Sequence, residues 1–135
     1  MILNIALCQS KDIINEYLKF MSEHFNIPAE ILPAMIAVES SYNQKAISPL
    51  GAVGLLQITR SAFIDFTNKT RYEISFNDVK SNWVINLTVG AWYLYHRCYK
   101  IKGNWKDAIT SYFWGSWSTN MTDCYYKKVK KRIKK

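Results

Sequence analysis

One carboxyl group in this sequence, that of Glu39, is placed where a glutamate can donate a proton. Glu39 follows the apolar run Met35-Ile36-Ala37-Val38 and precedes the polar run Ser40-Ser41-Tyr42-Asn43, so we expect it at the end of a helix, between core and loop. Glutamate titrates near ~4.3 in water, but apolar burial and the negative end of a helix dipole favour its protonated form. Such a group suits general acid catalysis on a leaving oxygen, such as that of a glycosidic bond.

The segment after Glu39 has the composition of an ordered binding loop. Gly51 and Gly54 allow the backbone to approach a ligand or a helix closely, and Gln57 can donate and accept hydrogen bonds with sugar hydroxyls and N-acetyl amides. The chain also has five tryptophans and nine tyrosines, whose rings can pack on the flat faces of sugars. We assign Trp83 and Trp92 to the core, because both lie on a predicted long helix.

The order of these residues resembles that of the soluble lytic transglycosylase-like (SLT) domain of the lysozyme-like superfamily. The run from Glu39 to Asn43 is similar to the family's catalytic Glu-Ser, aromatic, Asn motif, and Ser48 to Ile58 is similar to its Ser-Pro-x-Gly-Ala-x-Gly-Leu-Met-Gln-Ile stretch. Two later motifs are similar to Asn86-Leu87 with Gly90, and to the run from Ala108 to Gly115. The resemblance covers roughly residues 25–130.

The chain departs from the family pattern at three positions. Leu56 replaces a methionine of similar shape, Phe113 replaces an asparagine, and Pro33 lies within the expected catalytic helix. Tyr112 keeps its place, and we expect it to contact sugar or to hydrogen-bond the Glu39 carboxyl.

The acidic residues favour a reaction with one carboxylate. Glycosidases with two carboxylates place them about 5–9.5 Å apart, but no acid lies between Glu39 and Gln57, and Asp65 is expected on a surface helix. The resemblance therefore implies a peptidoglycan lytic transglycosylase, which cleaves the bond between N-acetylmuramic acid and N-acetylglucosamine and closes a 1,6-anhydromuramoyl ring. Glu39 would be the acid and then the base.

The resemblance adds substrate contacts from Ser40, Tyr42, Gln57, Tyr112 and Asn86, although Ser40 could instead cap the helix and Tyr42 could brace the loop.

Two other functions stay open. The same fold could hydrolyse the bond as a lysozyme-like muramidase, or it could serve as a non-catalytic wall-binding module of a phage or secretion machine. No metal or cofactor is implied, since His24 and His96 lack ligand spacing. The three cysteines favour buried free thiols over a disulfide between Cys98 and Cys124.

Periodic apolar positions predict a mainly α, single lysozyme-like domain with a substrate groove. We expect a first helix capped by Ser10 or Asp12, and a second with Pro28 in its first turn, either kinked at Pro33 or starting later. Further helical patterns cover 61–66 and 83–99, one helix begins with a capping box at Asn104 and Asp107, and the last begins near Thr122 or Asp123. Strand patterns are weak.

Basic residues concentrate at the C-terminus. The formal charge is +8, yet residues 1–126 hold 11 basic against 10 acidic groups, so we divide the chain into a catalytic domain (1–126) and a basic tail (127–135). The tail is interpreted either as a frayed, solvated end or as a docking segment for anionic wall polymer or membrane. Nucleic-acid motifs are lacking, and we expect a monomer.

The N-terminal residues 1–8 are apolar, but they lack the basic start and cleavage pattern of a signal peptide. The resemblance implies action in the cell wall or periplasm. We therefore expect a bacteriolytic, phage-encoded lysis or virion-associated protein, or one delivered with a secretion apparatus.

Overall fold

The protein folds as a single helical domain. The computed structural model describes residues 2–115 and 122–133, with side chains from Lys11 onward. Its helices, in chain order, are α1 (Ile2–Phe25), α2 (Ile31–Glu39), α3 (Arg60–Thr70), α4 (Phe76–Ser81), α5 (Trp83–Tyr93), the π-helical segment η1 (Leu94–Tyr99), α6 (Lys100–Lys102), α7 (Trp105–Trp114) and α8 (Cys124–Arg132). These residues contain two isolated β-bridges and no sheet, which confirms the mainly α class. None of the helices they form is long and apolar enough to cross a membrane.

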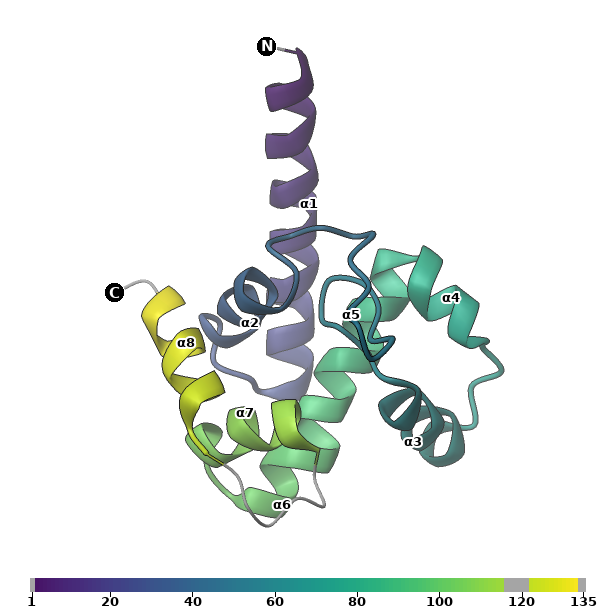
Figure 1. Cartoon of the computed structure of the whole chain (residues 1–135), viewed down its shortest axis with the longest axis vertical. Helices are drawn as coiled ribbons and strands as arrows, with labels where there is room; N and C mark the ends of the chain where they lie inside the picture. Colours follow the sequence, from purple (N-terminus) through teal and green to yellow (C-terminus); the bar gives the residue numbers. More distant parts are fainter. Residues whose placement is uncertain (1, 116–121, 134–135) are drawn as a thin grey trace.

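A long central helix organises the domain. Helices α5, η1 and α6 follow one another without a break (Figure 1). Figure 1 shows α2 and α8 on one side of this axis and α3 and α4 on the other, with the N-terminal half of α1 extending beyond the rest of the domain. The loop between α2 and α3 lies at the centre, beside α5.

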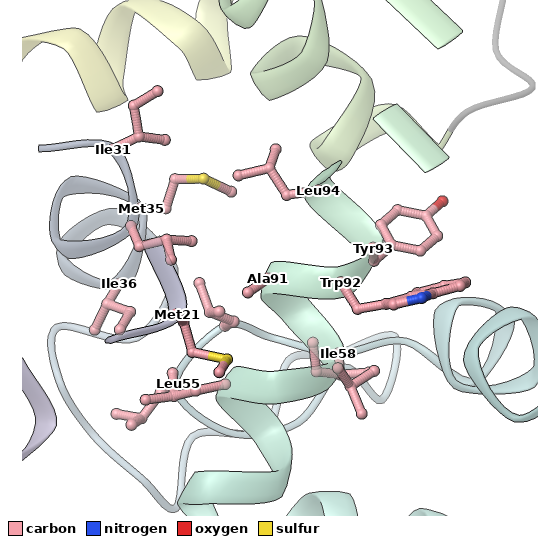
Figure 2. Packing of buried hydrophobic residues seen from close by; sticks show 14 of the residues in the cluster. Met21, Ile31, Met35, Ile36, Leu55, Ile58, Ala91, Trp92, Tyr93 and Leu94 are labelled. Carbon is pink, nitrogen blue, oxygen red and sulfur yellow. The ribbon is translucent and has the colours of Figure 1, made fainter. Parts of the chain in front are cut away.

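The core holds α2 against the central helix. Met35 of α2 points toward Leu94 of η1, and Met21 of α1 lies beside Leu55 of the loop between α2 and α3 (Figure 2). Met35, Leu94 and Leu55 are fully buried. Each such side chain contributes roughly 1.5–3 kcal/mol through burial, so several of them fix the position of α2, and with it that of Glu39.

Several helix boundaries differ from those predicted. Helix α1 begins at Ile2, so neither Ser10 nor Asp12 caps it. Helix α2 begins at Ile31, later than a start at Pro28, and Pro33 falls in its first turn, where a missing N–H costs no helical hydrogen bond. The short helix α4 was not predicted, although Ser75 and Asp78 form a capping box at its start. The predicted capping residue Asn104 does bind the Asp107 N–H at the start of α7, at 2.9 Å.

The expected boundary between domain and tail at residues 126 and 127 falls within helix α8. Helix α8 continues through Arg132, and Val129 within it is fully buried, so this part of the tail is packed rather than frayed. Cys98 is a buried free thiol, as favoured, whereas Cys124 is free and exposed; the two form no disulfide. The side chain of Cys8 lies outside the described residues.

The central loop (residues 40–59) is tied to the helices by Asn86 of α5. Its side-chain oxygen accepts a hydrogen bond from Leu56 N at 3.0 Å, and its Nδ2 donates to the carbonyl oxygens of Val53 (2.9 Å) and Val79 (3.1 Å). The Asn86 side chain lies directly over Gly54, which has φ +78°, and a Cβ at that glycine would overlap the amide. Gly54 is therefore required for the closest contact between the loop and α5.

We expect Gly54→Ala to destabilise the fold more than Gly51→Ala does. Both glycines have positive φ, but a Cβ at Gly51 (φ +88°) meets no atom within 4 Å. Both variants place an alanine at positive φ, so they share the cost of that backbone conformation. The difference between their free energies of unfolding therefore measures the cost of the overlap with Asn86, which we expect to be about 1–3 kcal/mol. Urea unfolding of both variants measures it; equal midpoints would mean that Asn86 moves aside without cost.

Candidate active site

Glu39 is the last residue of α2 and lies on its buried stripe. It follows Leu32, Met35 and Ile36 at helical spacing, and all three are fully buried. Burial raises the pKa of the Glu39 carboxyl from 4.5 to about 7, because a carboxylate loses hydration among apolar neighbours. Near neutral pH the group is therefore present in both protonated and ionised forms.

Two tyrosines surround the Glu39 carboxyl. Tyr125 of α8 is buried with its hydroxyl facing the carboxyl, and this contact lowers the pKa of Glu39, partly opposing burial. It is a close polar contact rather than a hydrogen bond of regular geometry. Tyr112 of α7 donates its hydroxyl hydrogen to the backbone oxygen of Leu56 at 2.7 Å, so it binds the loop in place of the expected bond to Glu39. Burial first, and the nearby Glu39 charge second, raise the pKa of Tyr112.

The turn after Glu39 is held in a strained conformation. Ser41 (φ 51°) and Tyr42 (φ 63°) both adopt left-handed backbone, which costs roughly 1–3 kcal/mol for each residue other than glycine. Ser40 hydrogen-bonds the Ile36 carbonyl oxygen through its backbone N–H (3.0 Å) and its hydroxyl (3.3 Å). Tyr42 donates its hydroxyl to Asn15 of α1 at 2.9 Å. In this structure Ser40 thus caps the helix and Tyr42 braces the loop on α1.

Gln57 lines an open pocket beside α7. Its Nε2 donates to the carbonyl oxygens of Ala46 (3.1 Å) and Gly54 (2.9 Å), and its own φ of 50° is left-handed. The pocket has a volume of about 330 Å³ and is lined by Gln57, Ile58, Thr59, Ser61, Ala62, Tyr93, Tyr112, Phe113, Trp114 and Gly115. We refer to it as the aromatic pocket. It brings together Gln57 and Tyr112 but not Asn86, which is 1% exposed with its amide engaged by the loop. Asn86 therefore holds the loop in place, and its contact with sugar stays a prediction.

Phe113 connects the aromatic pocket to Glu39. Phe113 is 53% exposed, and its ring stacks on the Tyr125 ring, with centroids 4.9 Å apart and planes at 13°. Trp114, also exposed, packs edge-on against Phe113. The phenylalanine at the position of the family's asparagine thus replaces a polar group with an aromatic surface and covers the tyrosine that contacts Glu39. The sequence interpretation did not identify Tyr125; its spacing of four from buried Val129 indicates an inward-facing residue.

No second carboxylate acts on Glu39 within the described residues. Burial and Tyr125 account for its pKa shift. Asp65, the first acid after Gln57, lies on α3 and forms an ion pair with Arg97 of η1 at 3.2 Å. Its charge is therefore engaged on the central helix. The described part of the site has the composition of a single-carboxylate centre.

Comparison with known proteins identifies a family for this chain. The protein-family model described as "Transglycosylase SLT domain" matches residues 16–134. This range includes Glu39, the central loop, and the two tyrosines beside the carboxyl. A search of curated proteins found no significant match.

We expect the stability of the wild-type protein, relative to Glu39→Gln, to fall as pH rises. The folded state binds the Glu39 proton more tightly than the unfolded chain does, because its pKa is raised from 4.5 to about 7. The resulting stabilisation is complete below the unfolded pKa and is lost as pH rises through the folded one. The glutamine variant stays neutral, so its relative stability should increase by about 3 kcal/mol between about pH 4 and about pH 8.

Urea unfolding of both proteins across this range provides the measurement. Glu16→Gln, on the exposed side of α1, is the control for losing one negative charge. A difference between wild type and Glu39→Gln that does not change with pH would contradict the raised pKa.

Proposed function

Because the chain belongs to the transglycosylase SLT domain family, which implies peptidoglycan cleavage of the lytic transglycosylase type, we propose that Glu39 is its single catalytic acid and base. The observation that carries this proposal is a carboxyl group with a pKa raised to about 7 by burial at the end of α2. A group with that pKa can both give and take a proton near neutrality. The implied substrate is a peptidoglycan glycan strand, and the implied place of action is the cell wall.

In the first step, protonated Glu39 gives its proton to the oxygen that joins N-acetylmuramic acid to N-acetylglucosamine. As this bond breaks, the acetamido group of the muramoyl unit stabilises the positive charge at its anomeric carbon. Burial favours the neutral carboxyl at this stage, and proton loss leaves a carboxylate facing Tyr125. The nearby hydroxyl stabilises that negative charge, which agrees with its lowering of the Glu39 pKa.

In the second step, the Glu39 carboxylate takes the proton of the muramoyl 6-hydroxyl as this oxygen closes on the anomeric carbon. The product is a 1,6-anhydromuramoyl end, no water is consumed, and Glu39 is again protonated. The absence of an acidic residue between Glu39 and Gln57 supports this route over hydrolysis. Glu39 thus acts first as the acid and then as the base, in place of two separate residues.

We assign sugar binding to the aromatic pocket. Phe113 and Trp114 offer exposed ring surface for the faces of sugar rings, and Gln57 and Tyr112 line the same pocket. Both donors on Gln57 Nε2 already bind the loop, so its amide oxygen is the atom we assign to substrate. Ser40 lies next to Glu39 and could turn its hydroxyl from Ile36 to an N-acetyl group.

Purified protein incubated with isolated sacculi should release muropeptides that end in 1,6-anhydromuramic acid. Mass spectrometry distinguishes this product from a reducing end, which is heavier by one water. We expect Glu39→Gln to reduce release by about 10³-fold or more, because the proton donor is lost. Reducing ends would favour the muramidase, and release unchanged by Glu39→Gln would contradict the central role of this residue. Lack of release by the wild type, with binding retained, would favour the wall-binding module.

Tyr125→Phe should shift the pH dependence of cleavage upward. Removing the hydroxyl removes the contact that lowers the Glu39 pKa, so the carboxyl should stay protonated to higher pH while the ring still packs on Phe113. The alkaline limb of the kcat profile against pH is the measurement. A lower rate without any shift of this limb would indicate a packing role only.

A further inference from the structure

A basic surface lies along α2 and α8, outside the residues assigned to catalysis. Three hollows adjoin there, of about 280, 400 and 610 Å³. The smallest and the middle one share Ala37 and Arg132, and the middle and largest share Lys11 and Tyr42. Together they form one continuous depression, here called the cationic groove, whose basic lining residues are Lys128, Lys131, Arg132, Lys11 and Lys45.

The charge of the cationic groove is nearly all of one sign. Its acidic lining residue within the described part of the chain is Glu30. Lys128, Lys131 and Arg132 form no ion pair there, whereas the neighbouring Lys127 pairs with Asp123 at 3.5 Å. Like charges that are brought together without counter-charges raise the local potential and attract an extended anion.

Helix geometry explains how α8 supplies these charges. Tyr125 and Val129 face inward and are buried. At about 100° per residue Lys127, Lys130 and Lys131 lie on the opposite face, and Lys128 and Arg132 border the buried pair on one side. All five are exposed. The helix therefore has a buried side that reaches Glu39 and an exposed side rich in basic residues.

We propose that the cationic groove binds a linear, phosphate-rich polymer of the cell wall. Its elongated form and repeated basic groups, drawn from α1, the central loop and α8, suit a chain of regularly spaced phosphates better than a single small anion. Arg132, shared by two hollows, can bind phosphate through two parallel N–H groups, while the lysines act as point charges.

The surface composition disfavours a membrane as the partner. An interfacial helix exposes large apolar side chains beside its basic ones, and no exposed large hydrophobic side chain of the described residues lines the cationic groove or lies on α8. Among the described residues, the aromatic ring that lines the groove is that of Tyr42, and Lys11 Nζ lies over it, 4.6 Å from the ring centroid. Stacking of nucleic-acid bases is disfavoured for the same reason.

The experiment measures binding of the full chain to poly(glycerol phosphate), by fluorescence anisotropy at several salt concentrations. Lys128→Glu with Lys131→Glu should weaken binding about tenfold or more and reduce its salt dependence. The matched control is Lys69→Glu with Lys100→Glu, which makes the same charge change at exposed sites on α3 and α6; it should change affinity less than about twofold. Equal losses in the two variants, or none in the first, would overturn the proposal.

Two further arms separate the alternatives. Vesicles of phosphatidylglycerol and phosphatidylcholine should bind more weakly than the polymer, and a preference for vesicles would overturn the choice of partner. The proposal rests on the proposed function only in placing the protein at the wall. Glu39→Gln should therefore keep full polymer affinity, and Lys128→Glu with Lys131→Glu should still cleave sacculi stripped of their polymer, which also shows that the variant folds.

Discussion

Burial of one carboxyl group at the end of an apolar helix is the constraint on which the rest of the structure depends. Leu32, Met35 and Ile36 bury one side of α2 in the core, and the same stripe carries Glu39 into the low-polarity region where its pKa rises to about 7. A buried carboxyl is unfavourable for the fold once it ionises. Two neighbouring features hold this carboxyl group in place. The strained turn at Ser41 and Tyr42 directly follows Glu39, and the Tyr125 hydroxyl contacts its carboxyl group.

The central loop is likewise held in one conformation by hydrogen bonds to the helices. Asn86 of α5 joins α4 and the loop through hydrogen bonds that use both the oxygen and the nitrogen of its side-chain amide. Tyr112 of α7 binds the loop at the backbone oxygen of Leu56. Gln57 closes the loop on itself at Ala46 and Gly54. Three residues that were predicted to contact substrate, Asn86, Gln57 and Tyr112, thus also hold the central loop in place.

The sequence predicted the helical class, the place of Glu39 and the loop with Gln57, because these depend on local periodicity and on a contiguous motif. It could not predict contacts between distant segments. Tyr125 meets Glu39 across 86 positions of chain, and its neighbours in sequence indicate only a helix. Asn86 was assigned to substrate because a motif gives the residue type without the direction of its side chain. The boundary between domain and tail was placed where the basic charge begins, and charge alone does not show that Val129 beyond this boundary is buried.

Helix α8 places two different selective constraints on one short stretch of sequence. The inward residues Tyr125 and Val129 must keep their size and shape, since both are buried and Tyr125 contacts the carboxyl group of Glu39. The outward residues are limited by the surface that they meet, which for this chain is the proposed phosphate-rich polymer, so they can vary where a relative meets a different surface. Among descendants of a common ancestor, the lysines of this helix should therefore drift in number and position, while the inward pair changes slowly. A lineage could in this way move to a differently charged wall without rebuilding its catalytic centre.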